Sequence, residues 1–164
     1  MTKPKSKELK ERSIDRTDRK ILRLLQADGR ISNKDLASKV NLSSTPCLRR
    51  VGLLEQSAVV QRYKAILDPE RLGFTIRAFI HITRKREVSR ESVWGEILAI
   101  PEVIACHVVS GDADLLVEVV ARDTKHYSEI LLDRINSIEG VYNLRSVFSL
   151  KPLKVDGDLP ITAA

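Results

Sequence analysis

Three short amphipathic segments, each opened by a residue that favours a helix start, lie within about 45 residues near the beginning of this 164-residue chain. The first opens at Asp15, a good N-cap with Asp18 three residues later, and apolar residues then recur at helical spacing until Gly29. Helices this short depend on packing against one another. The pattern therefore predicts a tight cluster of three helices.

The second and third segments are separated by only a few residues. Ser32 with Asp35 opens the second in the manner of a capping box, and Asn41 suits the left-handed turn that ends it. Ser43 or Ser44 caps the third, whose first turn tolerates Pro46 because an early helical N–H has no partner inside the helix. Two short helices joined by so tight a turn predict a helix-turn-helix.

The second helix of such a pair can enter the major groove of DNA. Its leading turn holds Ser44, Thr45, Cys47 and Leu48, while Arg49 and Arg50 point along its flanks toward bases or phosphates. Lys34 and the Ser32 end of the preceding helix are placed to meet the DNA backbone. A three-helix protein-interaction bundle would show the same pattern and stays open as an alternative.

The charge of the chain is distributed unevenly. Residues 1–67 carry 16 basic and 7 acidic side chains, a net charge of +9, and the remainder carries 12 and 15, a net charge of −3. A localised cationic surface attracts a polyanion, DNA or RNA first; a solvated lysine-rich surface is the alternative. Residues 1–13 are predicted to form a disordered basic arm, or simply a mobile terminus.

Cys47 and Cys106 lie too far apart in sequence for a disulfide framework or a C-x-x-C metal pair, which fits a reducing cytoplasm. The Lys-rich start does not resemble a secretory signal, and no apolar run approaches the length needed to span a bilayer. We therefore expect a cytoplasmic protein with no membrane partner.

From residue 59 onward the pattern becomes rich in β-branched residues. Residues 59–73 are predicted to be a β-rich hinge, because a Pro turn and Gly73 follow the run. Strands are then expected over 74–83, 103–109, 115–120 and 141–150, and helices over 89–99 and 124–137. The order βαββαβ predicts a ferredoxin-like sandwich in an α+β protein. The expected parts are an arm (1–13), a helix-turn-helix domain (14–58), the hinge (59–73), the sandwich domain (74–153) and a tail (154–164).

These segments resemble the leucine-responsive regulatory protein family, also called Lrp/AsnC or feast/famine, over residues 14 to about 153. The resemblance is carried by IDRTDRKIL at 14–22, DGRIS at 28–32, LSSTPCLRRV at 42–51 followed by Leu54-Glu55, and VVSGDADLL at 108–116. It implies a three-helix winged-type helix-turn-helix and an ACT-like, amino-acid-sensing domain that dimerises by sheet packing and often assembles into octamers. The implied function is sequence-specific transcription regulation of amino-acid metabolism.

The resemblance assigns Ser44, Thr45, Pro46, Cys47 and Arg50 to the recognition helix and Gly111, Asp112 and Asp114 to the effector loop. The complete predicted sets add residues placed by the helix-turn-helix geometry and by the loop and strand sequence. For double-stranded DNA the predicted residues are Ser32, Lys34, Ser43, Ser44, Thr45, Pro46, Cys47, Arg49 and Arg50. For a small effector they are Ser110, Gly111, Asp112, Asp114 and Ser146. A Gly-Asp turn presents backbone N–H groups and a carboxylate that suit an amino acid, although an ordinary hairpin turn would have the same sequence.

The chain departs from the family pattern at three positions of the third helix. Gly52 and Leu53 stand where a basic or polar residue is usual, and Ala58 stands where the helix-ending Gly is usual. Gly52 should cost its helix roughly 1 kcal/mol relative to Ala. Phosphate contacts are therefore not expected from positions 52 and 53, and Leu53 is a candidate for a subunit contact.

No catalytic constellation is evident in the sequence. His81, His107 and His126 are scattered, and no Gly-rich phosphate loop occurs, so we expect no metal, no cofactor and no enzymatic activity. The main alternative is an enzyme on the same architecture, because siroheme decarboxylases resemble this family. An RNA-binding sheet is a further alternative, disfavoured by an aromatic content of 4%.

Overall fold

The computed structural model describes residues 13–162, which form two compact units. One holds residues 13–66 together with 154–162, and the other holds residues 67–153. The predicted basic arm at 1–13 lies outside the described residues except for Ser13. Within the described part, no helix is both long and apolar enough to cross a bilayer.

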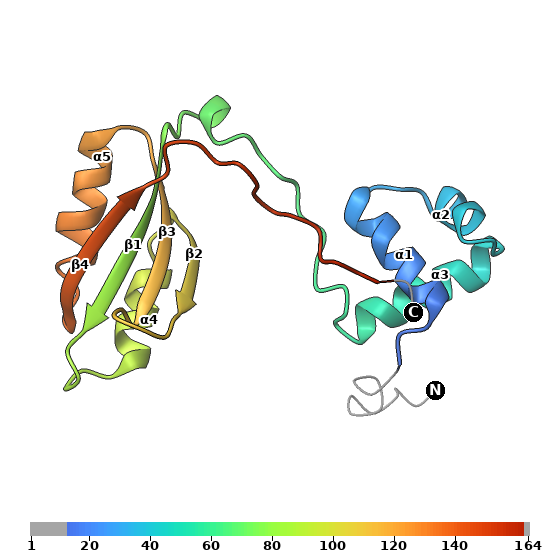
Figure 1. Cartoon of the computed structure of the whole chain (residues 1–164), viewed down its shortest axis with the longest axis horizontal. Helices are drawn as coiled ribbons and strands as arrows, with labels where there is room; N and C mark the ends of the chain where they lie inside the picture. Colours follow the sequence, from blue (N-terminus) through green and yellow to red (C-terminus); the bar gives the residue numbers. More distant parts are fainter. Residues whose placement is uncertain (1–12, 163–164) are drawn as a thin grey trace. The chain divides into compact units, whose positions relative to one another are not determined.

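The first unit is built on three helices, as predicted: α1 (Arg16–Ala27), α2 (Asn33–Lys39) and α3 (Ser44–Gln56) (Figure 1). Asp15 and Asp18 form a reciprocal capping box at the start of α1, and the Ser32 hydroxyl accepts from the Asp35 amide at the start of α2. Ser43 is the N-cap of α3 but makes no side-chain capping bond. Two of the three predicted caps thus bond through their side chains.

One apolar cluster holds the three helices together. Its buried members are Ile21, Leu22, Leu36, Ala37, Val40, Cys47 and Leu54. Each helix contributes at least two of them, so none of the three could keep its inner face from water without the others.

The turns on either side of α3 each place a residue other than glycine in the left-handed backbone region. Asn41, between α2 and α3, has φ 58°, as its residue type predicts. Ala58, just after α3, has φ 57° and lacks the amide side chain that makes this conformation tolerable for Asn.

The predicted β-rich hinge contains no strand. Residues 61–68 are extended, and the short helix η1 (Glu70–Leu72) follows. Residues 59–66 belong to the helical unit and 67–73 to the other, so the boundary falls inside the predicted hinge. Within residues 13–66 there is no strand after α3 to form a wing, because β-rich sequence forms a ladder only where a second strand pairs with it.

The C-terminal tail returns to the helical unit. The Gln26 side-chain amide donates to the carbonyl of Leu159 (3.2 Å) and accepts from its amide (2.9 Å), and Ile161 packs against the apolar cluster. The end of the tail lies against the helices in Figure 1. No sequence pattern predicted this contact of the tail.

The second unit has the predicted βαββαβ order. Its strands are β1 (Ile76–Arg84), β2 (Val103–Val108), β3 (Leu115–Ala121) and β4 (Val141–Phe148), and its first helix is α4 (Arg90–Leu98). The helix predicted over 124–137 begins as α5 (Thr124–Ser128) and continues with π-helical bonding as η2 (Glu129–Ile135). The sheet is antiparallel with spatial order β2-β3-β1-β4, which is the ferredoxin-like arrangement.

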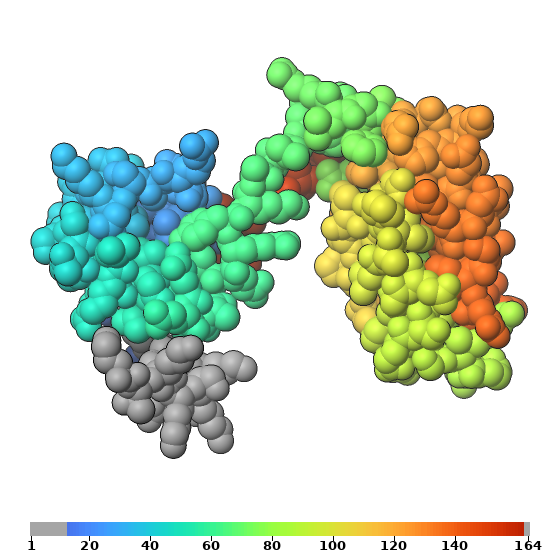
Figure 2. All heavy atoms as spheres, turned by 180° about the vertical axis from the view of Figure 1, so that it is seen from behind, coloured from blue at the N-terminus to red at the C-terminus, as the bar shows by residue number. Residues whose placement is uncertain are grey.

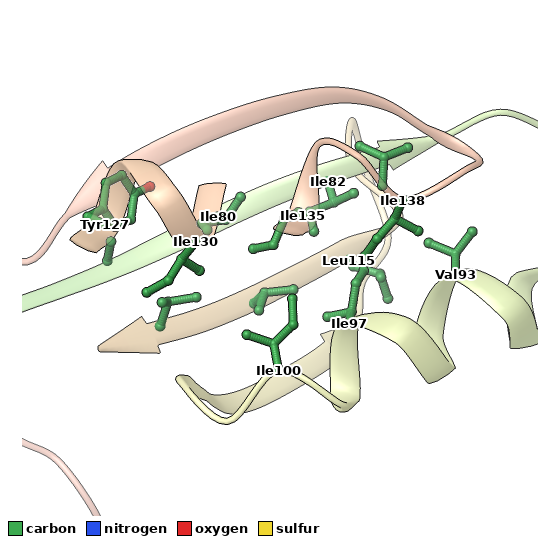
Figure 3. Packing of buried hydrophobic residues seen from close by; sticks show 14 of the residues in the cluster. Ile80, Ile82, Val93, Ile97, Ile100, Leu115, Tyr127, Ile130, Ile135 and Ile138 are labelled. Atoms are coloured by element: carbon green, nitrogen blue, oxygen red, sulfur yellow. The ribbon is translucent and has the colours of Figure 1, made fainter. Parts of the chain in front are cut away.

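Both helical segments cover the same face of this sheet. Alternate strand residues such as Ile80, Ile82 and Val117 are fully buried against Val93 and Ile97 of α4 and against the α5–η2 segment. Figure 3 shows these side chains meeting between helices and strands, and Figure 2 shows α4 and α5 from behind. The other sheet face carries no helix of this unit.

Candidate functional site

The outward face of α3 carries four exposed side chains in its first two turns. Ser44 and Thr45 begin the helix, and Leu48 and Arg49 follow one turn later. Leu48 is 60% exposed although it is apolar. This helix face thus combines hydroxyl, apolar and basic side chains. Side chains of these kinds contact base edges and thymine methyl groups in a major groove.

Two residues predicted to contact DNA instead face the interior of the helical unit. Cys47 has no exposed surface, so it is a core residue rather than a DNA contact. Arg50 directs its guanidinium at α1, where Nη1 lies 2.6 Å from Asp15 Oδ2 and 2.8 Å from Asp18 Oδ1. The position of α1, which helical periodicity does not reveal, decides both orientations.

This cluster is electrostatically well matched. The backbone amide of Asp18, and secondarily Arg50, hold the pKa of the Asp15 carboxyl below its ordinary value. Hydrogen bonds to Asp15 and Asp18 raise the pKa of Arg50. Because the Asp18 side chain is only 1% exposed, the ion pair fastens α3 to α1 at a buried point.

Helix α2 contributes an exposed lysine at its start and a positioning residue. Lys34 is exposed at its start, while the Ser32 hydroxyl is occupied with Asp35. Asn33, which the sequence analysis missed, donates from its side chain to the carbonyl of Ser44 at 3.0 Å and so ties the two helices of the motif together. An asparagine at N1 of a helix gives no signal of this bond, because its partner lies across the turn.

The predicted effector loop is the connection between β2 and β3. Gly111 has φ 112°, which only glycine adopts readily, and Ser110, Gly111 and Asp112 are all exposed. The Thr83 hydroxyl donates to the Asp112 carbonyl at 3.2 Å, which holds the loop beside the end of β1. The Asp112 carboxylate has no recorded partner among the described residues.

Asp114 has a structural bond that the sequence could not reveal. Its Oδ2 accepts from the backbone amide of Arg84 at 2.9 Å, and its own amide donates to the carbonyl of Ile82 at 2.9 Å. Asp112 is therefore the loop carboxylate that remains available to a ligand.

Ser146 does not join the loop. It lies opposite Ile80 on the helix-covered side of the sheet, where its Oγ accepts from the Tyr127 hydroxyl at 2.5 Å. Its neighbour Arg145 faces the other side and, with His81 and Asn143, lines a small cavity of about 120 Å³ against Asp112 and Ala113. Neighbouring strand residues point to opposite faces, so an error of one position reverses the assignment.

A second cavity, of about 520 Å³, adjoins the same loop. It is lined by Thr83, Arg84, Arg86, Arg90 and residues 111–114. These arginines were not among the predicted site residues, although the basic run at 84–86 is visible in the sequence.

Neither cysteine has the environment of a nucleophile. Burial raises the pKa of both the Cys47 and the Cys106 thiol, which disfavours the reactive thiolate. Within residues 13–162, no three His, Cys, Asp or Glu side chains gather as metal ligands.

A helix-turn-helix with an open recognition face, joined to a ferredoxin-like unit with a polar loop cavity, defines a ligand-responsive transcription regulator. Family models match both parts: the AsnC-type helix-turn-helix domain over residues 14–55 and the Lrp/AsnC ligand binding domain over residues 77–159. The chain belongs to the Lrp/AsnC family of transcription regulators.

Characterised relatives cover nearly the whole chain. The Bkd operon transcriptional regulator of Pseudomonas aeruginosa is 39% identical over 150 residues, covering 90% of this chain and 98% of that protein. The leucine-responsive regulatory protein of Escherichia coli K12 is 36% identical over 158 residues, covering 95% and 96% respectively.

Solved structures show the same fold. A transcriptional regulator from Neisseria meningitidis in complex with L-methionine has a TM-score of 0.87 at 36% identity, covering 90% of this chain and 97% of that one. A feast or famine regulatory protein from Mycobacterium tuberculosis, also with L-methionine, has a TM-score of 0.84 at 31% identity, covering 92% and 100%. These comparisons confirm the family, the fold class and the transcription-regulator function predicted from the sequence.

Proposed function

We propose that this regulator reads its operator with the outward face of α3. Ser44, Thr45, Leu48 and Arg49 would meet base edges, while Lys34, Ser32, Ser43 and Pro46 would lie near the phosphate backbone. The observation that carries this proposal is the exposure of those four α3 side chains on one face, next to a turn fixed by Asn33. We take residues 14–58 as the DNA-binding domain and 59–73 as the connection to the effector domain at 74–153.

Arg50 has a positioning role in this proposal. Its guanidinium is engaged by two carboxylates of the α1 start, so it sets the angle of α3 rather than reading bases. Direct DNA contact falls instead to Arg49, which is exposed and has no ion pair recorded within residues 13–162.

The effector is an amino acid bound at the loop of residues 110–114, and the genes controlled belong to amino-acid metabolism. Two observations support this: the exposed Gly111-Asp112 turn beside a cavity, and the L-methionine bound by two structural relatives. Backbone amides of the turn suit the α-carboxylate and Asp112 suits the α-ammonium. A regulator that acts on chromosomal DNA works in the cytoplasm.

The functional protein is a homo-oligomer, a dimer that can assemble into octamers. The support for this proposal is the sheet face that no helix of this unit covers. On that face Phe79 of β1 lies between Glu118 of β3 and Val147 of β4, and Val147 is 47% exposed. Packing two such faces would remove this apolar surface from water.

We further propose that the chain is not an enzyme. The siroheme-decarboxylase-like alternative requires a bound tetrapyrrole, so it predicts a coloured protein after purification. A colourless protein that binds DNA would count against that alternative, and an absorbing one would favour it.

The test of DNA recognition needs no known operator. Full-length protein is used to select binding sites from random double-stranded DNA, and the affinity for a selected site and for scrambled DNA is measured over a range of salt. Specific binding that weakens steeply with salt supports the proposal. Failure to enrich any sequence, or equal binding of both DNAs, would contradict it.

A further inference from the structure

The larger of the two cavities beside the effector loop is unusually basic. Three arginines line it, Arg84 at the end of β1, Arg86 in the following loop and Arg90 at the start of α4, against two carboxylates, Asp112 and Asp114. Their formal charges leave the lining with a surplus of one positive charge.

Arg84 and Asp114 are both engaged in bonds within the fold. The Arg84 amide donates to Asp114 Oδ2, and its guanidinium Nη1 donates to the carbonyls of Val88 (3.0 Å) and Lys85 (3.1 Å). The Nε of Arg84, however, is a buried donor with no hydrogen-bond partner, since Asp114 Oδ1 is 3.9 Å away. A buried donor without an acceptor is costly, and an anionic ligand in the cavity would supply one.

Arg86 and Arg90 are exposed and have no ion pair recorded among the described residues. A neutral amino acid would use one cation for its carboxylate and Asp112 for its ammonium. The remaining arginine would then stay uncompensated. A second carboxylate on the ligand would pair with it and bring the occupied cavity to charge balance.

A smaller cavity, which shares Thr83, Asp112 and Ala113 with the larger one, strengthens this preference. It is also lined by Arg145, and its only carboxylate is the same Asp112. Each cavity beside the loop therefore offers an arginine to an anionic ligand.

Resting on the proposed effector role of this loop, we propose that its ligand is an acidic amino acid, with two carboxylates and one ammonium. Arg86 and Arg90 hold the carboxylates and Asp112 holds the ammonium. The two structural relatives were solved with L-methionine, whose side chain is uncharged. The arginine-lined cavity of this chain would favour a ligand that carries a second negative charge.

The test measures calorimetric affinity and thermal shift of the full-length protein with six L-amino acids: glutamate, aspartate, their amides glutamine and asparagine, methionine and leucine. An acidic ligand should bind about tenfold or more tightly than its amide, a difference that one charge-assisted contact supplies. Glutarate and inorganic phosphate test whether an anion alone suffices.

Variants connect the preference to the cavity. In the Arg86→Gln/Arg90→Gln double variant the ratio of acid to amide affinity should fall toward one, whereas Lys85→Gln, at an exposed neighbour outside the cavity lining, should preserve it. Asp112→Asn should weaken amino acids but not glutarate. The variants' melting temperatures without ligand verify their folding.

The outcomes separate the two proposals. Equal affinity for acid and amide, or tighter binding of methionine or leucine, overturns the acidic preference and leaves the effector role standing. Phosphate or glutarate binding as tightly as glutamate overturns the amino-acid assignment in favour of a general anion site. No response to any of the six amino acids overturns the acidic preference and the proposed amino-acid effector together.

Discussion

Nη1 of Arg50 in α3 lies 2.8 Å from Oδ1 of Asp18 in α1, a carboxylate whose side chain is 1% exposed. The two residues are 32 positions apart in the chain. The pair fixes the recognition helix against the helix behind it, so the position of the DNA-reading face depends on a residue turned away from that face.

Replacing Arg50 by Ala should therefore act first on stability. Removing one partner of a buried ion pair leaves a desolvated charge, and we expect the helical unit to lose about 2–4 kcal/mol of unfolding free energy. Denaturant unfolding followed by circular dichroism measures this loss. An unchanged unfolding midpoint with lost DNA binding would assign Arg50 to the DNA interface instead.

Arg49→Ala should behave in the opposite way. This exposed side chain has no recorded ion pair in residues 13–162 to lose, so stability should change by less than about 0.5 kcal/mol. The binding free energy for a selected operator should weaken by about 1–3 kcal/mol. If Arg49 contacts a base, specificity at one base pair should relax. If it contacts a phosphate, the dependence of log affinity on log salt concentration should become shallower by about one unit of slope. If the variant bound the operator with the affinity of the wild-type protein, Arg49 would not belong to the DNA interface.

Ala58→Gly should stabilise the helical unit. Ala58 has φ 57°, a backbone conformation that costs an L-residue about 1–2 kcal/mol. Glycine removes that cost. It also gives the unfolded chain more conformational freedom, which lowers stability by a smaller amount. We expect a net gain of about 0.5–1 kcal/mol in chemical denaturation. The matched control is Ala27→Gly at an exposed position in α1, which should destabilise by up to about 1 kcal/mol.

The docked tail should contribute to the stability of the helical unit. Ile161→Ala removes part of a side chain packed on the apolar cluster and should lower the unfolding free energy by about 1–2 kcal/mol. Leu159→Ala is the control, because its side chain is 72% exposed and only its backbone pairs with Gln26. Equal effects of the two substitutions would show that the docking is not maintained in solution.

The Asp15 carboxyl should give the helical unit an acid-sensitive contribution to stability. The pKa of Asp15 in the folded protein lies below the ordinary value of 3.8. The contribution of Asp15 to stability is therefore complete at pH values above the ordinary pKa. It is lost as the pH falls through the lowered pKa of the folded protein. Asp15→Asn should flatten the dependence of melting temperature on pH in this acid range. An unchanged dependence in the Asp15→Asn variant would contradict this prediction.

The sequence by itself determined the elements and their order. Asp15, Ser32 and Asn41 act through backbone groups within a few residues of themselves, so their caps and turns can be read locally. Runs of β-branched and apolar residues between turn residues likewise predicted four strands, and Gly111 marked the turn that only glycine adopts without strain.

Only the tertiary structure decided which way the functional side chains point. Periodicity groups residues on a common face but does not say which other element that face meets. Cys47 is therefore found in the core and Arg50 against the start of α1, while Arg145 rather than Ser146 borders the effector loop. The Gln26–Leu159 contact spans 133 positions. Such contacts are set by packing between distant segments, and a single sequence carries no local mark of them.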